Sequence, residues 1–139
     1  MNDFELDPRL AADTVLLGRC AGGQLRLMND ARWPWVLLVP EQAGVSQLHE
    51  LDAADAATVL STSLAVARAM TSAEPGRRIN TGALGNVVAQ LHLHHVLRHE
   101  EDPAWPGPVW GFGERTPYAE PLLAPAVARW QDVLSELLD

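Results

Sequence analysis

The sequence predicts an α+β domain in which helices pack on an antiparallel sheet. Three observations predict this class. Segments with strand patterns outnumber segments with helical spacing, a glycine-containing turn can join the first two strands as a hairpin, and parallel crossovers are not available. The chain has 139 residues with neither an internal repeat nor a linker, so we expect residues 1–139 to form one domain.

The first strands are predicted from apolar alternation. Residues 14–19 and 24–29 flank a turn at residues 20–23 that contains Gly22 and Gly23, which is typical of a hairpin. Residues 35–39 are apolar throughout and stop at Pro40, as expected of a central strand covered on both faces.

The period changes after residue 51. Apolar residues recur every three or four positions from residue 53 to residue 70, and Asp52 is a good N-cap, so this segment predicts a long helix. Short strands are expected at residues 77–80 and 89–98. A C-terminal helix should present one apolar face and either begin near Pro125 or kink there.

Composition excludes several function classes. All ten basic residues are arginine, which removes any mechanism that needs a lysine to bind phosphate, form a Schiff base or act as a general base. The formal charge of −8 argues against nucleic acid as a partner. No apolar run is long enough for a membrane span, the acidic start is unlike a signal peptide, and Cys20 is the single cysteine. We therefore expect a cytoplasmic protein without a membrane partner.

Histidines mark the candidate site. Four of the five fall within eight positions, at His92, His94, His95 and His99. Side chains alternate along a strand, so one face should carry Gln90, His92 and His94. The other should meet the core with Leu91, Leu93, His95 and Leu97. Neighbours on one face lie roughly 6–7 Å apart, so one imidazole could attack a phosphate group that the next one contacts.

The same spacing also suits solvated surface histidines or a pair of metal ligands. We expect His95 to be a partly buried structural residue and His99 to lie on the surface. His49 receives no role. The glycines of the loop before the histidines, Gly82 and Gly85, could bring backbone N–H donors beside the imidazoles or could serve ordinary turns.

The chain resembles the histidine triad (HIT) superfamily, whose hallmark strand alternates three histidines with apolar residues. Here that signature reads Gln90-Leu91-His92-Leu93-His94-His95-Val96. The resemblance spans nearly the whole chain and is strongest to a bacterial branch, through the runs at residues 79–80, 84–88 and 102–111. It implies a sheet of about five strands with a long helix, a homodimer and no metal cofactor. It also implies a nucleotide hydrolase or transferase similar to diadenosine polyphosphate hydrolases or phosphoramidases, acting on a purine mono- or dinucleotide.

The resemblance also implies roles for individual residues. His92 would attack the α-phosphate of the nucleotide and carry it as a nucleotidyl intermediate, and His94 would contact the phosphate oxygens. Asn80 would support the phosphate pocket. The remaining implied contacts, to phosphate and to ribose, involve Gly85, Asn86, Asn29 and Asp30.

Three positions depart from the family pattern. Gln90 stands for the first histidine of the triad, and Asn86 and Val87 stand for a Gln-Ser/Thr pair. Gln90 keeps a carbonyl that can orient the His92 ring, but its side chain cannot carry a proton, and Val87 cannot donate to a leaving group. An alternative is therefore a nucleotide sensor without turnover.

A metal site at His92 and His94 is a third hypothesis. Trp105 could also wall the pocket of a neighbouring subunit.

Overall fold

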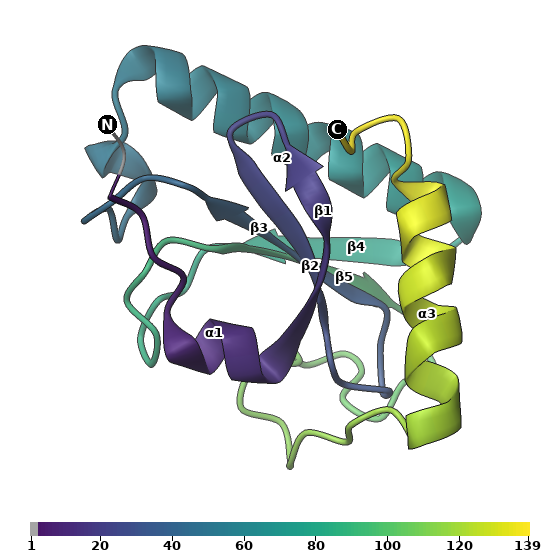
Figure 1. Cartoon of the computed structure of the whole chain (residues 1–139). Helices are drawn as coiled ribbons and strands as arrows, with labels where there is room; N and C mark the ends of the chain where they lie inside the picture. The colour runs from purple at the N-terminus through teal and green to yellow at the C-terminus, as the bar shows by residue number, and fades with distance from the viewer. Residues whose placement is uncertain (1–2) are drawn as a thin grey trace.

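The computed structural model describes residues 3–139 as one antiparallel sheet with helices on both faces (Figure 1). The sheet order is β1-β2-β3-β5-β4, and every pairing is antiparallel. The elements in chain order are α1 (Pro8–Asp13), β1 (Thr14–Cys20), β2 (Gly23–Met28), β3 (Trp35–Pro40), a 3-10 turn (Leu48–Glu50), α2 (Ala53–Ala73), β4 (Arg78–Gly82), β5 (Leu93–Arg98) and α3 (Glu120–Val133). The predicted α+β class and antiparallel sheet are confirmed.

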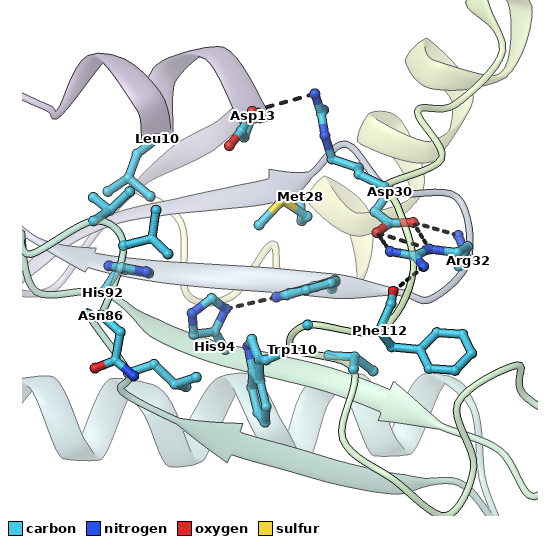
Figure 2. A pocket seen from close by; sticks show the side chains of 18 of the residues that line it. Leu10, Asp13, Met28, Asp30, Arg32, Asn86, His92, His94, Trp110 and Phe112 are labelled. Atoms are coloured by element: carbon cyan, nitrogen blue, oxygen red, sulfur yellow. Dashed lines mark hydrogen bonds and ion pairs between the residues drawn. The ribbon is translucent and has the colours of Figure 1, made fainter.

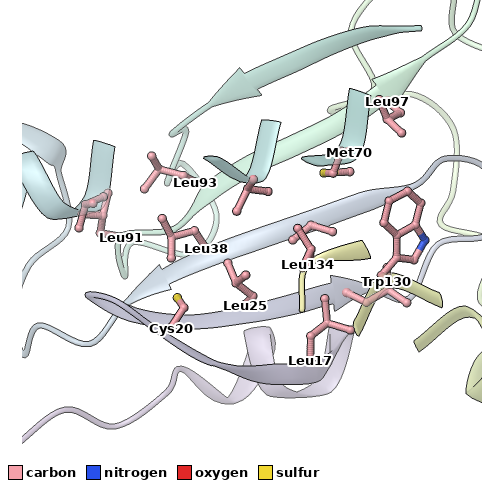
Figure 3. Packing of buried hydrophobic residues seen from close by; sticks show 14 residues of the cluster. Leu17, Cys20, Leu25, Leu38, Met70, Leu91, Leu93, Leu97, Trp130 and Leu134 are labelled. Atoms are coloured by element: carbon pink, nitrogen blue, oxygen red, sulfur yellow. The ribbon is translucent and has the colours of Figure 1, made fainter. Parts of the chain in front are cut away.

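One side of the sheet packs against α2 and α3 (Figure 3). Leucines of the central strands, including Leu25, Leu38 and Leu93, meet Met70 of α2 and Trp130 of α3 in this cluster. All five side chains are almost completely buried. Burial of this apolar area is the main force holding the helices on the sheet.

A second cluster lies on the opposite face. It joins Leu10 of α1 to Trp35 and Leu37 of β3, Val96 of β5 and Trp33. The side chains of β3 and β5 therefore alternate between the two clusters, as the period of a strand requires. This second face carries the pocket described below.

The first hairpin is confirmed at β1 and β2. Gly23 opposes Pro40 in the neighbouring strand, and a side chain at this position would collide with the carbonyl oxygen of Val39. Glycine is therefore required where β2 begins beside β3.

The histidine strand is shorter than predicted. We expected a strand over residues 89–98, but β5 runs from Leu93 to Arg98. The reason is that the residues before Leu93 are paired with neither neighbouring strand. The pairing of β3 with β5 ends at Leu38 and Leu93, and that of β4 with β5 ends at Gly82 and His94. His92 therefore stands just before the strand.

Two helices also differ from expectation. The C-terminal helix does not begin near Pro125, the first of the two alternatives, but at Glu120, so that Pro125 lies inside it. Proline is tolerated there because only the first turn precedes it, so a single intrahelical hydrogen bond is lost. Helix α1 was not predicted, although Asp7 caps its backbone at Arg9 and Pro8 opens its first turn, both ordinary helix-start signals.

Candidate functional site

A pocket of about 420 Å³ opens on the face of the sheet opposite α2 (Figure 2). Its walls come from α1, the ends of β2 and β3, the loop before β5 and the extended segment after β5. The lining residues are Leu10, Asp13, Met28, Asp30, Arg32, Trp35, residues 84–88, His92, His94, residues 109–113 and Arg115. Polar groups thus converge on a mostly apolar cavity, which is typical of a small-molecule site.

The ring of His92 is held by the backbone just before it. Its Nδ1 lies 2.6 Å from the carbonyl oxygen of Gln90, and a carbonyl oxygen can only accept a hydrogen bond. Nδ1 therefore carries the proton of the neutral ring, which leaves the lone pair of Nε2 free. A buried imidazole with a free lone pair can act as a nucleophile or accept a proton.

His94 lies beside His92, with ring centroids 4.8 Å apart in an edge-to-face arrangement. Its Nδ1 lies 3.0 Å from the indole Nε1 of Trp35. Burial, followed by the nearby His92 and His95, lowers the pKa of His94 to about 3. His94 is therefore neutral at physiological pH.

His95 is turned to the other face of the sheet, as its place in the strand predicts. It is fully buried, with Nδ1 3.1 Å from the carbonyl oxygen of Val36 and Nε2 2.7 Å from the hydroxyl of Ser63 on α2. Burial lowers its pKa to about 4. The predicted structural role is consistent with these contacts, and the residue is more deeply buried than expected.

The side chain of Gln90 is directed away from the lining of the pocket and toward the N-terminal segment. Its Oε1 accepts a hydrogen bond of 2.8 Å from the backbone N–H of Asp7, and its Nε2 donates one of 2.7 Å to the carbonyl oxygen of Glu5. The backbone of Gln90 orients His92, while the amide fixes the segment that leads into α1. The two halves of this residue therefore serve different elements.

The loop before β5 forms one side of the pocket with Gly85, Asn86 and Val87. Gly85 has a φ of +73°, in the left-handed region that glycine adopts without strain. Val87 is 80% exposed, and its backbone carbonyl oxygen accepts a 2.9 Å hydrogen bond from the guanidinium of Arg9 on α1. Hence α1 and the loop are joined at the pocket.

Asp30 lies in the pocket with 1% of its surface exposed. Its carboxylate accepts hydrogen bonds from the backbone N–H, Nε and Nη2 of Arg32, and Arg32 also donates to the carbonyl oxygen of Phe112. A buried carboxylate is stable here because a charged, bidentate partner accompanies it. The pair also holds the segment after β5 against the pocket.

Two further predicted site residues lie outside the lining, as Gln90 does. Asn29 accepts a hydrogen bond from the backbone N–H of Tyr118 with its side chain. The Asn80 carboxamide oxygen accepts one from Arg98, whose guanidinium also pairs with Asp102. Both asparagines therefore stabilise segments near the site.

Most of the apolar walls of the pocket were not predicted from the sequence. These are Leu10, Met28, Trp35, Trp110 and Phe112, together with the cations Arg32 and Arg115. Arg32 stands two residues after Asp30, and this spacing could have indicated the ion pair between them. The aromatic residues gave no usable signal, because the same residues also fill protein cores.

Trp105 and His99 lie elsewhere. Both line a second cavity beside β4, and Arg98 sits over the Trp105 ring at 5.6 Å. His99 is exposed, as predicted. A contribution of Trp105 to a neighbouring subunit stays a prediction.

Similarity to known proteins identifies the family. The model of the HIT domain family matches residues 12–101. This chain belongs to the HIT family. Proteins of this family are generally nucleotide hydrolases or transferases. The matched region contains Asp30, the loop before β5 and the two pocket histidines, so it covers the site as well as the sheet.

Solved HIT structures have the same fold over nearly the full chain. A histidine triad protein from Marinobacter aquaeolei is 45% identical, with 96% of this chain and 98% of that chain covered and a TM-score of 0.92. One from Sinorhizobium meliloti is 44% identical, with 96% and 99% covered and a TM-score of 0.87. One from Bradyrhizobium japonicum is 31% identical, with 98% of each chain covered and a TM-score of 0.88. No curated protein matches the chain significantly.

Two further properties bear on the alternatives. Across residues 3–139, no three or more histidine, cysteine, aspartate or glutamate side chains are grouped so that they could hold a metal ion. In the same part of the chain, no helix has both the length and the apolar character needed to cross a membrane.

Proposed function

We propose that this HIT protein cleaves a nucleotide at its α-phosphate through a nucleotidyl intermediate on His92. The observation that supports this most strongly is the hydrogen bond from His92 Nδ1 to the Gln90 carbonyl. It leaves the Nε2 lone pair available inside a pocket that also contains a neutral His94. These are the requirements for nucleophilic catalysis by imidazole.

The proposed reaction has two displacements at phosphorus. In the first, His92 Nε2 forms a bond to the α-phosphorus while the bond to the leaving group breaks, and the leaving group departs with that electron pair. In the second, water attacks the same phosphorus and releases a proton to solvent, while the N–P bond breaks and the imidazole recovers its lone pair. The products are a nucleoside monophosphate and the free leaving group.

The other predicted residues take roles that fit their positions. Gly85 and Asn86 would contact phosphate oxygens from the loop, and Val87 would border the leaving group. The Asp30 carboxylate would accept hydrogen bonds from the ribose hydroxyls. Asn29, Asn80 and the Gln90 side chain would act on the segments around the pocket, because their side chains bond to backbone or to Arg98.

We propose a purine mono- or dinucleotide as the substrate, with a phosphoanhydride or phosphoramidate bond to be cleaved. The apolar walls from Leu10 and Met28 suit a nucleobase, which is flat and weakly polar on its faces. The second candidate function is a nucleotide sensor without turnover. It is favoured by Val87, whose exposed side chain offers no donor to a leaving group.

The deciding experiment is intact-protein mass spectrometry after brief incubation with adenosine 5′-phosphoramidate or, separately, a diadenosine polyphosphate. We expect a transient adduct of AMP mass in the wild type and none in His92→Asn. His99→Asn is the matched control, since this exposed histidine lies outside the pocket. Product analysis on the same samples shows which leaving group is accepted.

The outcomes separate the two functions. Product without an adduct would still indicate an enzyme, with a fast second displacement. Binding without adduct or product over hours would favour the sensor. A His92→Asn variant that keeps most of its turnover would exclude the proposed mechanism.

We also propose that the protein is a cytoplasmic homodimer. β4 is an edge strand of the sheet, and the neighbouring α2 exposes Leu60 and Leu64 at 48% and 56%. An edge strand beside exposed leucines is a surface that a second copy can cover by extending the sheet and burying the leucines.

A further inference from the structure

Trp35 and His94 are neighbours on the pocket face of adjacent strands. Leu37 of β3 is paired with His94 of β5, so Trp35, two residues earlier, lies diagonally across from the histidine on the same face. The indole Nε1 is 3.0 Å from His94 Nδ1, and the dashed line at His94 in Figure 2 marks this contact. Both side chains are buried, at 7% and 6% exposed.

This contact determines which nitrogen of His94 carries the proton. An indole N–H can only donate, so His94 Nδ1 must accept, and its lone pair must point at Trp35. A neutral imidazole has one N–H, which then has to be on Nε2. A doubly protonated ring would direct Nδ1–H against the indole N–H, which agrees with the lowered pKa of His94.

The result is a pair of neighbouring imidazoles with opposite tautomers. His92 has its proton on Nδ1 and its lone pair on Nε2, because the Gln90 carbonyl accepts from Nδ1. His94 has its lone pair on Nδ1 and its proton on Nε2, because Trp35 donates to Nδ1. Since the two nitrogens of one ring point in different directions, the His94 N–H is directed away from Trp35.

We propose that Trp35 is a positioning residue that holds His94 in the Nε2–H tautomer, so that His94 gives an N–H donor to a phosphoryl oxygen at His92. The catalytic part of this proposal rests on the proposed function. In the other tautomer, the Nε2 lone pair would face the negative oxygens of the phosphate and repel them. Trp35 removes that state before substrate arrives, so no reorientation is needed during the reaction.

Nuclear magnetic resonance tests the tautomer directly on the nucleotide-free protein. In uniformly 15N-labelled wild type at neutral pH, the imidazole 15N shifts of His94 should show a protonated Nε2 and an unprotonated Nδ1. A scalar coupling between Trp35 Nε1 and His94 Nδ1 across the hydrogen bond should be measurable. A protonated Nδ1 in the wild type would overturn the proposal without any variant.

Trp35→Phe removes the donor and keeps an aromatic ring in the space. The control is Trp33→Phe, because Trp33 is also a buried indole on this face and its Nε1 has no hydrogen-bond partner among residues 3–139. We expect mixed tautomers of His94 in Trp35→Phe and the wild-type tautomer in Trp33→Phe. An unchanged His94 spectrum in a folded Trp35→Phe would overturn the proposal.

Kinetics test the consequence for the reaction. We expect kcat of Trp35→Phe to fall roughly tenfold with little change in KM, since the lost interaction acts mainly in the transition state. Trp33→Phe should keep the wild-type kcat. A changed tautomer with an unchanged kcat would exclude the catalytic consequence. If wild type turned over no nucleotide, the proposed function would fail, while the spectra would still decide the tautomer.

Discussion

His95 and His94 are consecutive residues with different environments. His94 borders the pocket, whereas His95 joins the sheet to α2 through Ser63 and to β3 through the Val36 carbonyl. The carbonyl accepts from Nδ1, so Nε2 accepts from the Ser63 hydroxyl. A histidine cluster in a sequence therefore combines catalytic and structural candidates, and strand alternation separates them.

Replacing Ser63 by alanine should destabilise the protein without affecting the pocket. The change leaves His95 Nε2 buried without its partner, and we expect the free energy of unfolding to fall by about 1–3 kcal/mol. Urea unfolding measures this loss. Ser61→Ala on the exposed side of the same helix is the control and should cost nothing comparable. An equal loss in both variants would contradict the assigned contact.

At the scale of elements, the N-terminal segment is part of the pocket. Gln90 holds the backbone at Glu5 and Asp7, α1 follows, and Leu10 and Asp13 of α1 line the cavity. Next to this, the Asp7 carboxylate accepts hydrogen bonds from Arg9, which hold the pKa of that carboxyl below its usual value. Gln90 therefore anchors one wall of the pocket.

Gln90→Ala should loosen that wall. We expect the amide proton of Asp7 to exchange roughly tenfold faster with solvent, because its hydrogen bond to the Gln90 side chain is lost. We expect the KM for substrate to rise, while the free energy of unfolding should change little. Gln131→Ala is the matched control, since that glutamine also bonds a backbone carbonyl but on the far side of the sheet. Unchanged exchange at Asp7 would exclude the anchoring role.

The elements that could be predicted from the sequence are those with a clear period. The hairpin, β3 and α2 follow apolar alternation or helical spacing, and their positions are confirmed. The predicted start of β5 is wrong, because the extent of a strand depends on its ladder partners in the surrounding fold. Of the two alternatives for α3, a start near Pro125 is wrong, because the helix begins at Glu120 and runs through the proline. The short α1 has no apolar period at all, so only its cap could have shown it.

In the candidate site, too, some residues could be predicted from the sequence and others could not. His92, His94 and the loop before β5 were predicted as one site, and the structure brings them together with Asp30. For Trp35 the sequence predicts a strand position and a packing role, because nothing in the sequence shows that an indole N–H is directed at a histidine across the sheet. Pairings between distant segments need the register of the strands, which a single sequence does not contain.

For the whole molecule, the two buried histidines make stability depend on pH. In the folded state the pKa of His94 is about 3 and that of His95 about 4, against an ordinary value of 6.5. Between pH 6.5 and 4 the unfolded chain therefore binds more protons than the folded protein, so stability falls as pH falls. At pH values well above 6.5 both states are neutral at these positions and the effect vanishes.

We expect the free energy of unfolding to drop by about 2–3 kcal/mol between pH 7.5 and pH 5.5, from two histidines together. Urea titrations at fixed protein concentration across this range measure it. His49→Gln is the control for removing an exposed histidine. A flat profile would contradict neutral burial of the pair.

The proposed dimer is tested by mass in solution. Wild type should elute with light scattering at twice the 15.1 kDa of the chain, and Leu64→Glu should shift it toward the monomer. Leu122→Glu on α3 is the control, since Leu122 is similarly exposed, but α3 packs against β1, at the opposite edge of the sheet from β4. A monomeric wild type, or dissociation by both variants alike, would exclude the surface formed by α2 and β4.

The indoles around His94 also give the protein an optical signal. Trp35 donates to this imidazole, and the Trp110 ring centroid lies 5.4 Å from it. Indole emission responds to hydrogen bonding, to nearby imidazole and to water leaving its surroundings. A phosphate group arriving at His94 should therefore change the intrinsic fluorescence, so that binding can be followed without a dye or a labelled nucleotide. The same change in fluorescence can be measured in His92→Asn, where it reports occupancy of the pocket in the absence of any reaction.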